Sequence, residues 1–321
     1  MNKFEKFRCL IVGAGKMGLA HAKVMSRMSD VAVLVWAPSK KRFSDFGSLG
    51  VDLRSSTLTD SIENFNPSHV IIASPVETLC EVASRIMDFG VKEILVEKPA
   101  VIDFHSGVRL QQKAKALKAN VFIGYNRRFY SSFQSVIQKI QNEKDVLRAI
   151  HFQFDEPFLD ENPPKNQSKT ALSRWVLSNS LHVIDSAFLA TGLPEIDQIT
   201  CYASGSLSWH EAGSYYAGFG NVGKNVNFSY NASWGTPGKW SVDWITSKYR
   251  YHFSPLEEVK ILKQGSFDYE AMVLDNSLDL DFKPGLFSQN ESFLYSINTE
   301  KLATLNDALK LVELGKKMGN Y

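Results

Sequence analysis

Residues 8–18 read RCLIVGAGKMG, an apolar run that leads into three glycines spaced as G-x-G-x-x-G. A helix is expected to begin near Leu19, directly after the last glycine. In this setting Gly13 permits a tight turn, Gly15 lets a pyrophosphate approach the backbone, and Gly18 lets the helix pack closely on the strand. The free N–H groups at the helix N-terminus would bind the anion. A glycine-rich turn without a ligand is the alternative, and the strand-to-helix setting favours dinucleotide binding.

The first 125 residues alternate short apolar runs with helix-length segments. The runs, which we expect to be strands, are residues 9–12, 31–36, 70–73, 94–96 and 121–123. The expected helices between them include residues 17–28, 78–89 and 104–118. This alternation is typical of βαβ units and of a parallel sheet covered on both faces. We therefore predict an α/β protein in which residues 1–125 form a doubly wound Rossmann domain.

The pattern changes after about residue 145. Aromatic and polar residues alternate at 151–154 and across 234–253, with turn residues at 235–238, which predicts an antiparallel meander. Two helices are expected beside it, at about 173–190 and 305–318. We assign residues 126–321 to a substrate and oligomerisation domain and leave open whether the C-terminal helix packs back on the first domain. The aromatic residues of the meander are expected at an interface between copies of the chain: Trp209, Tyr215, Tyr216, Trp234, Trp240 and Trp244.

Charge and composition narrow the classes of partner. The 36 Lys and Arg against 34 Asp and Glu give a net charge of +2, so neither nucleic acid nor a membrane surface is expected as a partner. No apolar stretch is long enough to span a membrane, and no signal peptide is expected. The three scattered cysteines suit free thiols in the cytoplasm. The histidines and cysteines show no metal-ligand spacing, so no metal site is predicted.

The end of the second strand bears on the choice of nicotinamide cofactor. NAD sites usually have Asp or Glu there, to bind the ribose 2′-hydroxyl. Here residues 31–36 are followed by Ala37-Pro38-Ser39-Lys40-Lys41-Arg42, a hydroxyl and three cations without a carboxylate. Such donors suit a 2′-phosphate, and Ser39, Lys40 and Arg42 are the expected contacts. A solvated basic helix start would look the same; we favour NADP over NAD.

A lysine follows the fourth predicted strand, in the turn Glu97-Lys98-Pro99. Ligands of open parallel sheets bind outside the carboxyl ends of the strands. Lys98 is therefore expected at that edge, near the nicotinamide, where it could hold a substrate hydroxyl or share its proton. The alternative is a lysine whose apolar stem is buried and whose ammonium reaches water.

Several stretches together resemble one family, the glucose-fructose oxidoreductase / inositol dehydrogenase / MocA-like (Gfo/Idh/MocA) oxidoreductases. The resemblance covers most of the chain and rests on residues 13–18, 73–75, 97–99, 124–129, 182–185 and 282–287. It implies a Rossmann domain followed by an α/β domain with a large, mostly antiparallel sheet. It also implies that Lys98 lies at the nicotinamide and substrate, that the Lys98–Pro99 peptide bond is cis, and that His182 is the acid/base.

The resemblance and the motifs together give the expected site residues. Those expected to contact the cofactor are Gly13, Gly15, Lys16, Met17, Gly18, Ser39, Lys40, Arg42, Ser74, Pro75, Glu97, Lys98, Asn126 and Arg127. For Asn126 and Arg127 a structural role is an equal alternative. Many relatives carry Asp four residues before the histidine, and here that position is Ser178, which cannot act as a carboxylate base. Arg174, Trp175, Ser178 and Asp185 are candidate substrate contacts, and a structural role is the alternative for Arg174 and Asp185.

The resulting expectation is an NAD(P)-dependent oxidoreductase of a sugar or sugar derivative, including nucleotide-linked or surface-polysaccharide sugars. Lys98 and His182 are its expected catalytic residues. Two alternatives stay open: an enzyme of a non-sugar diol or carbonyl, and a non-catalytic NADP-binding sensor or scaffold. The expected partners are a small molecule and further copies of the chain, in a homodimer or homotetramer formed through the antiparallel sheet.

Overall fold

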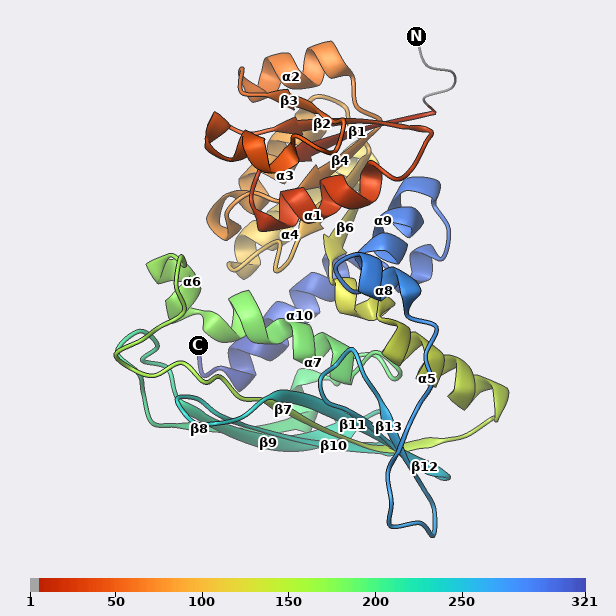
Figure 1. Cartoon of the computed structure of the whole chain (residues 1–321). Coiled ribbons are helices and arrows are strands. Elements are labelled where there is room, and N and C mark those ends of the chain that lie inside the picture. Colours follow the sequence, from red (N-terminus) through yellow and green to blue (C-terminus); the bar gives the residue numbers. More distant parts are fainter. Residues whose placement is uncertain (1–5) are drawn as a thin grey trace. The chain divides into compact units, whose positions relative to one another are not determined.

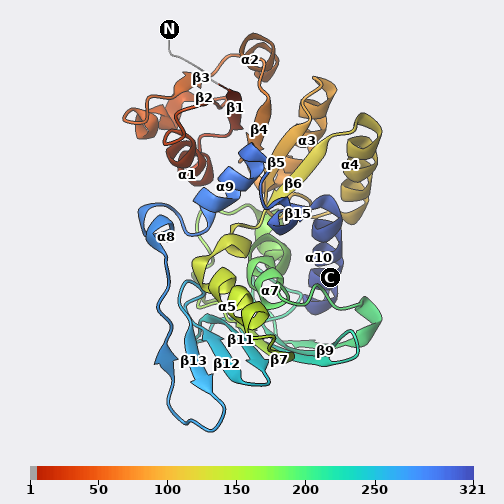
Figure 2. The same ribbon diagram turned by 90° about the vertical axis from the view of Figure 1, so that its right-hand side faces the viewer.

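The computed structural model describes residues 6–321 and divides into two compact units (Figures 1 and 2). The first unit comprises residues up to Phe129 together with Ser277–Leu309, and the second comprises Tyr130–Asn276 and Lys310–Tyr321. The sequence-based division assigned all of 126–321 to the second domain, whereas the structure groups 277–309 with the first. One helix of this segment packs on the first helix of the chain, and Tyr295 Oη donates to Asp30 Oδ1, in the turn after that first helix, at 2.7 Å.

The first unit is built on a seven-stranded sheet of order β15-β6-β5-β4-β1-β2-β3. Its strands are β1 (Phe7–Val12), β2 (Val31–Trp36), β3 (Asp52–Arg54), β4 (His69–Ile72), β5 (Glu93–Glu97), β6 (Asn120–Gly124) and β15 (Ala303–Thr304). All neighbours pair in parallel except β15, which runs antiparallel to β6. The doubly wound sheet predicted from the alternating apolar runs is confirmed.

Helices cover both faces of this sheet. The helices of the unit are α1 (Lys16–Met25), α2 (Leu58–Phe65), α3 (Leu79–Asp88), α4 (Phe104–Leu117), α8 (Ser277–Asp281) and α9 (Leu286–Tyr295). Figure 2 shows α1 and α9 on one face and α3 and α4 on the other. The central strands are buried on both sides, as in β4, whose four residues are all buried. Continuous apolar runs are what such double burial requires.

The second unit is an eight-stranded sheet of order β14-β13-β12-β11-β7-β10-β9-β8. Its strands are β7 (Leu147–Phe154), β8 (Ile199–Ser204), β9 (Tyr215–Val222), β10 (Val226–Ser233), β11 (Trp240–Thr246), β12 (Tyr249–Phe253), β13 (Lys260–Lys263) and β14 (Glu270–Ala271). Only β7 and β10 pair in parallel. The mostly antiparallel sheet is therefore confirmed.

The second unit's helices pack on one face of its sheet (Figure 1). They are α5 (Ser131–Asn142), α6 (Lys169–Ser173) and α7 (Leu181–Ala187), and α10 (Leu305–Met318) runs from the first unit into the second. The single helix expected over 173–190 is found only in part. Two short helices flank a π-helical segment (Val176–Ser180) instead, and Gly192 ends the turn that follows at a positive φ of 77°.

The meander aromatics divide between core and surface. Trp209, Tyr216, Trp234 and Trp244 are buried inside the unit, so the expectation that they form an interface between copies is wrong for these four. They lie on the helix-covered face, where Trp244 Nε1 donates to the Ala187 carbonyl at 2.8 Å. Tyr215 points the other way and is 48% exposed. Alternation along the strand decides which face each side chain takes.

Candidate functional site

The glycine loop between β1 and α1 has the geometry that its sequence predicts. Gly13 has a φ of 121°, and a Cβ atom there would lie 2.4 Å from the Ala73 carbonyl oxygen. A Cβ atom on Gly18 would lie 1.9 Å from the Gly13 carbonyl oxygen, so both positions require glycine. By contrast, nothing lies within 4 Å of a Cβ atom built on Gly15. The space above Gly15 is open to a ligand.

The N-terminus of α1 faces that space without competition from side chains. Gly15 is its N-cap residue and makes no side-chain capping hydrogen bond, and no acidic residue lies in the first turn. The first N–H groups of a helix have no partners within the helix and carry its positive partial charge. The loop and helix start therefore suit a phosphate or pyrophosphate.

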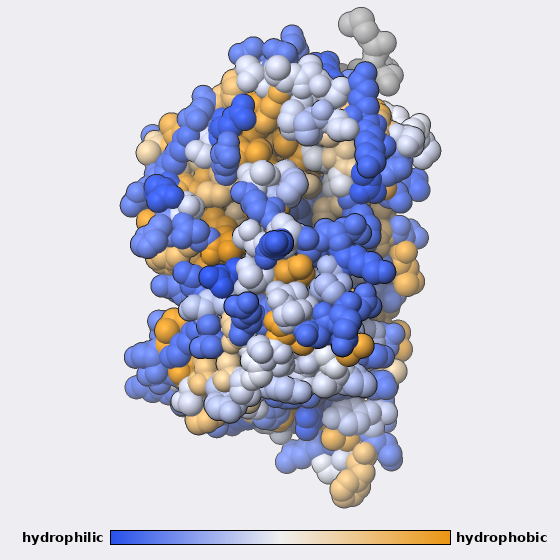
Figure 3. Space-filling view, turned by 90° about the vertical axis from the view of Figure 1, so that its left-hand side faces the viewer, coloured by the Kyte–Doolittle hydropathy of each residue, from blue (hydrophilic) through white to orange (hydrophobic). Residues whose placement is uncertain are grey.

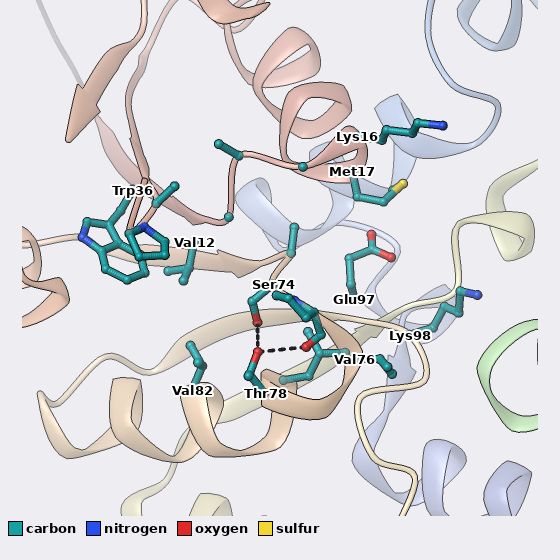
Figure 4. A pocket seen from close by; sticks show the side chains of 18 residues that line it. Val12, Lys16, Met17, Trp36, Ser74, Val76, Thr78, Val82, Glu97 and Lys98 are labelled. Atoms are coloured by element: carbon teal, nitrogen blue, oxygen red, sulfur yellow. Dashed lines mark hydrogen bonds between the residues drawn. The ribbon is translucent and has the colours of Figure 1, made fainter. Parts of the chain in front are cut away.

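A cavity of about 710 Å³ opens beside this loop in the first unit (Figure 4). It is lined by Val12, Gly13, Ala14, Gly15, Lys16, Met17, Trp36, Ala37, Pro38, Ala73, Ser74, Pro75, Val76, Thr78, Leu79, Val82, Glu97 and Lys98. These residues follow the carboxyl ends of β1, β2, β4 and β5, where ligands of parallel sheets bind. The size and mostly apolar walls are typical of a cofactor site. Figure 3 shows hydrophobic residues gathered in patches among the hydrophilic ones on one side of the molecule.

Most of the residues expected at the cofactor line this cavity, and others do not. Gly18 lies behind the loop, against Gly13. Asn126 is buried in a 3-10 turn (Asn126–Phe129), where its Nδ2 donates to the Pro284 carbonyl at 2.8 Å, and neither it nor Arg127 lines the cavity. Conversely, Trp36 and Val82 line it and had not been singled out. The end of the second strand was the available signal for Trp36.

The expected phosphate contacts lie in a short helix after β2. Lys40–Phe46 form a 3-10 helix whose N-cap, Ser39, accepts a hydrogen bond from the Lys41 N–H at 3.2 Å. Arg42 Nε donates to Asp45 Oδ2 at 3.1 Å in a partly exposed pair. Ser39, Lys40 and Arg42 do not line the cavity, which Ala37 and Pro38 border just before them.

Lys98 stands where β5 ends. The strand's apolar residues are fully buried, Glu97 is 8% exposed, and Lys98 is half-buried on the cavity wall. Figure 4 shows the Lys98 ammonium and the Glu97 carboxylate directed to different sides. The Lys98–Pro99 peptide bond is cis, which confirms that expectation. The Ala100 N–H donates to the Glu97 carbonyl at 3.0 Å and closes the turn.

The remaining candidates belong to the second unit. His182 is 7% exposed on α7, and Ser186 Oγ donates to its carbonyl at 2.8 Å. Asp185 and Trp175 are also buried, with Trp175 packed edge-to-face on Trp209. The Arg174 guanidinium lies 4.7 Å from the centre of the Tyr321 ring. These contacts tie Arg174 and Trp175 to an aromatic cluster within the unit.

Ser178 and its neighbour make different contacts. Ser178 Oγ lies 2.7 Å from the Ala171 carbonyl and 3.1 Å from the Arg174 carbonyl, so its hydroxyl is directed at the backbone. Asn179 Nδ2 donates to the Glu156 carboxylate at 2.7 Å. Glu156 follows β7 and is only 4% exposed. The contact between Glu156 and Asn179 could not be predicted from the sequence, because 23 positions separate the two residues.

Three further observations bear on the classes of site present. Among residues 6–321, no three His, Cys, Asp or Glu side chains are placed to hold a metal ion. In the same range, no helix has both the length and the apolar character needed to cross a membrane. Cys9, Cys80 and Cys201 are free thiols, and burial raises the pKa of Cys9 to about 12.

Comparison with known proteins identifies relatives. Residues 7–125 match the family model GFO_IDH_MocA, described as an oxidoreductase family with an NAD-binding Rossmann fold. An inositol 2-dehydrogenase of Rhizobium meliloti (strain 1021) is 26% identical over 134 residues, which are 41% of this chain and 40% of that protein. A scyllo-inositol 2-dehydrogenase (NAD(+)) of Bacillus subtilis (strain 168) is 28% identical over 151 residues, 46% of this chain and 44% of that protein. The matched region thus spans under half the length of either curated relative.

The fold is shared over a longer stretch. The solved structure of UDP-N-acetylglucosamine 3-dehydrogenase from Acidithiobacillus ferrooxidans superposes with a TM-score of 0.75 at 17% identity, covering 98% of this chain and 97% of that one. At this identity the likeness concerns the fold. Together with the family match, it confirms the resemblance seen in the sequence motifs. Residues 7–125 match the model of the NAD-binding Rossmann fold of the Gfo/Idh/MocA oxidoreductase family.

Proposed function

We propose that this protein is an NAD(P)-dependent oxidoreductase that transfers a hydride between a nicotinamide and a hydroxyl- or carbonyl-bearing carbon of a sugar or sugar derivative. One observation carries the proposal: a single cavity has the glycine loop, Trp36 and Lys98 on its walls. Figure 4 shows Trp36 and Lys98 at opposite ends of it. A dinucleotide whose pyrophosphate binds at the glycine loop would place its adenine end near Trp36 and its nicotinamide near Lys98.

The cavity's residues fit such a cofactor. The open space above Gly15 and the uncapped start of α1 suit a pyrophosphate. NADP is the proposed preference, because Ala37 and Pro38 border the cavity where NAD-specific sites carry an acid, and Ser39, Lys40 and Arg42 follow. We also propose that Asn126 and Arg127 contact the cofactor.

The proposed chemistry divides between cofactor and protein. When bound, the nicotinamide accepts a hydride from the carbinol carbon or returns one to a carbonyl carbon. The protein must then move the accompanying proton from or to the substrate oxygen. We propose Lys98 and His182 as the residues that handle this proton.

Many relatives carry an aspartate four residues before the histidine. This chain has Ser178 at that position, and the serine hydroxyl is directed at backbone carbonyls. Glu156 is a buried acid whose carboxylate accepts a hydrogen bond from Asn179, the residue after Ser178. We propose that Glu156 supplies the negative charge that Ser178 cannot. A Glu156→Gln variant would keep an acceptor for Asn179 and remove the charge, so lower turnover without loss of folding would support this role.

The substrate class rests on relatives. The curated matches are named as dehydrogenases of inositols, and the similar solved structure is named for a nucleotide-linked amino sugar. We propose a polyhydroxylated ring, free or nucleotide-linked, whose contacts include Arg174, Trp175 and Asp185.

The decisive experiment follows nicotinamide absorbance while the protein meets a panel of inositols, free sugars, nucleotide-linked sugars and their keto forms. NADP(H) and NAD(H) are run in parallel. Lys98→Met should lower kcat by about 10²–10⁴-fold while cofactor affinity is kept, and Lys115→Met, an exposed lysine on α4, is the matched control. Turnover that survives in Lys98→Met would contradict the proposal.

Two other functions give different results in the same assay. Activity on non-sugar diols or carbonyls alone would indicate a different substrate class. Tight cofactor binding without turnover anywhere would indicate a sensor or scaffold, which is the function that Ser178 favours.

Self-association through the second unit's sheet is proposed as well. Tyr202, Tyr215 and Phe219 lie on the face away from the helices, with exposed fractions of 65%, 48% and 62%. An aromatic surface of this kind suits a second copy of the chain in a homodimer or homotetramer. Light scattering should give a lower molar mass for a Tyr202→Glu/Phe219→Glu variant than for the wild-type protein. The free thiols accord with a cytoplasmic location, which we also propose.

A further inference from the structure

Three polar side chains from distant parts of the chain meet inside the first unit. His21, on α1, has its Nε2 atom 2.9 Å from Glu97 Oε1. Its other ring nitrogen, Nδ1, lies 2.9 Å from Asn290 Oδ1 on α9. His21 and Asn290 are 0% exposed and Glu97 is 8% exposed. We call these residues the His21–Glu97–Asn290 triad.

The backbone makes room for the Glu97 carboxylate. Glu97 pairs with Gly124 across β5 and β6. A Cβ atom on Gly124 would lie 3.1 Å from Glu97 Oε1 and 3.3 Å from Glu97 Cδ. Any larger residue at 124 would therefore press on the carboxyl group. The glycine and the imidazole bound the carboxylate on two sides.

The chemistry of the three groups fixes their roles. An ionised carboxylate can only accept hydrogen bonds, so His21 Nε2 carries the hydrogen and donates to Glu97. The Asn290 Oδ1 atom faces His21 Nδ1 and can accept a hydrogen bond from it. His21 therefore holds the Glu97 carboxylate by a directional hydrogen bond, and Asn290 fixes the orientation of the His21 ring.

Stability alone does not account for the triad. Burying polar and charged groups carries a desolvation cost, and packed apolar residues of similar volume often stabilise a core as well or better. The elements that carry the triad also contribute apolar residues to the unit's core, among them Ala22, Met25 and Leu95. The triad's distinguishing feature is its location: Glu97 lines the cavity and directly precedes Lys98.

We propose that His21 and Asn290 are positioning residues that fix Glu97, and through it the direction in which Lys98 enters the cavity. This inference rests on the proposed function, because it takes Lys98 as the group that contacts the substrate. With Glu97 released, the turn after β5 would present the ammonium in several orientations. A displacement of about 1 Å at a reacting centre can cost about 100-fold in rate.

Two variants of His21 separate positioning from packing. His21→Leu fills the space and removes the donor, and kcat should fall about 10- to 100-fold while the dissociation constant of NADPH changes by less than about threefold. His21→Gln restores an N–H donor toward Glu97 and should recover most of that loss. His105→Leu, an exposed histidine on α4, is the control and should leave kcat unchanged.

A second readout does not depend on activity. Pyridoxal 5′-phosphate followed by borohydride labels lysine side chains. Peptide mass spectrometry then compares the labelling rate of Lys98 with that of the exposed Lys115. His21→Leu should change the Lys98-to-Lys115 labelling ratio by about threefold or more, because the geometry of the turn controls access to the amine that forms the Schiff base. His21→Gln should return the ratio towards that of wild type.

The outcomes distinguish this inference from the proposed function. Turnover that persists in Lys98→Met would overturn the proposed function. If Lys98→Met is inactive while folded His21→Leu keeps wild-type kcat and labelling ratio, the positioning role is overturned and the function stands. Should His21→Leu fail to fold, Asn290→Ala takes its place, with the same fall in kcat expected and an unchanged kcat counting against the inference.

Discussion

The carbonyl oxygen of Gly13 lies 1.9 Å from the position that a Cβ atom on Gly18 would occupy. That approach lets α1 start directly beneath the loop and aim its first N–H groups at the cavity. Gly15, in the same loop, has open space at its own Cβ position. The loop's glycines therefore serve different ends, one for folding and one for the ligand.

Alanine at these two positions should produce opposite defects. Gly18→Ala must displace backbone and should lower the free energy of unfolding by about 1–3 kcal/mol or more. Gly15→Ala, at a φ of −78° that alanine tolerates, should leave stability nearly unchanged and weaken cofactor binding, because its methyl group enters the pyrophosphate space. Thermal unfolding and cofactor titration of both variants provide the test. Wild-type affinity in Gly15→Ala would exclude a pyrophosphate at this loop.

Cofactor preference should depend on Arg42. Its present partner, Asp45, is a partly exposed acid three residues on, and such pairs contribute at most about 1 kcal/mol. The guanidinium can therefore turn to a 2′-phosphate at little cost. Arg42→Ala should weaken NADPH binding about tenfold and leave NADH binding unchanged, with Lys41→Ala as the neighbouring control. Equal affinity of the wild-type protein for NADPH and NADH would contradict the assignment.

Ser178 should prove structural. Its hydroxyl approaches the Ala171 and Arg174 carbonyls, and a carboxylate in its place could donate to neither. Ser178→Ala should cost about 1 kcal/mol of stability and leave kcat within about twofold. Ser178→Asp should destabilise more, because an acceptor would face two acceptors. Denaturant unfolding and the turnover assay measure both effects; higher activity in Ser178→Asp would show that the position belongs to the catalytic machinery.

Stability should fall on mild acidification because of His69. Burial lowers the pKa of this imidazole from 6.5 to about 4. Between these two pKa values His69 is protonated in the unfolded chain and neutral in the folded chain. The free energy of unfolding therefore decreases as the pH falls from 6.5 towards 4. The expected loss is about 2 kcal/mol at about pH 5.

A His69→Phe variant isolates this effect. It keeps the edge-to-face contacts with Phe7 and Phe293 and removes the titrating group. Urea unfolding at pH 7 and at pH 5 should show that the free energy of unfolding depends less on pH in the variant than in wild type. Burial also lowers the pKa of His210, so part of the pH dependence will persist in the variant. An equal pH dependence in both proteins would refute the assignment to His69.

The sequence by itself determined the first unit's sheet, the glycine loop, the lysine at the end of β5 and the antiparallel second sheet. These features depend on local patterns: apolar runs of strand length, glycines where a Cβ atom cannot fit, and alternation along strands. The terminal helix was placed at 305–318, where the structure has α10. The helix over 173–190 was placed only in part, because residues 176–180 are π-helical and α7 ends at Ala187.

Only the tertiary structure decided which distant residues meet. Residues 277–309 return to the first unit, and His21 meets Asn290 across 269 positions and Glu97 across 76. A single sequence carries no pattern for such a meeting, because each of the three side chains would be equally plausible as a surface residue. Their burial follows from how α1, β5 and α9 pack. The sequence thus placed Lys98 at the cavity, and packing between remote segments decided how the turn that carries it is held.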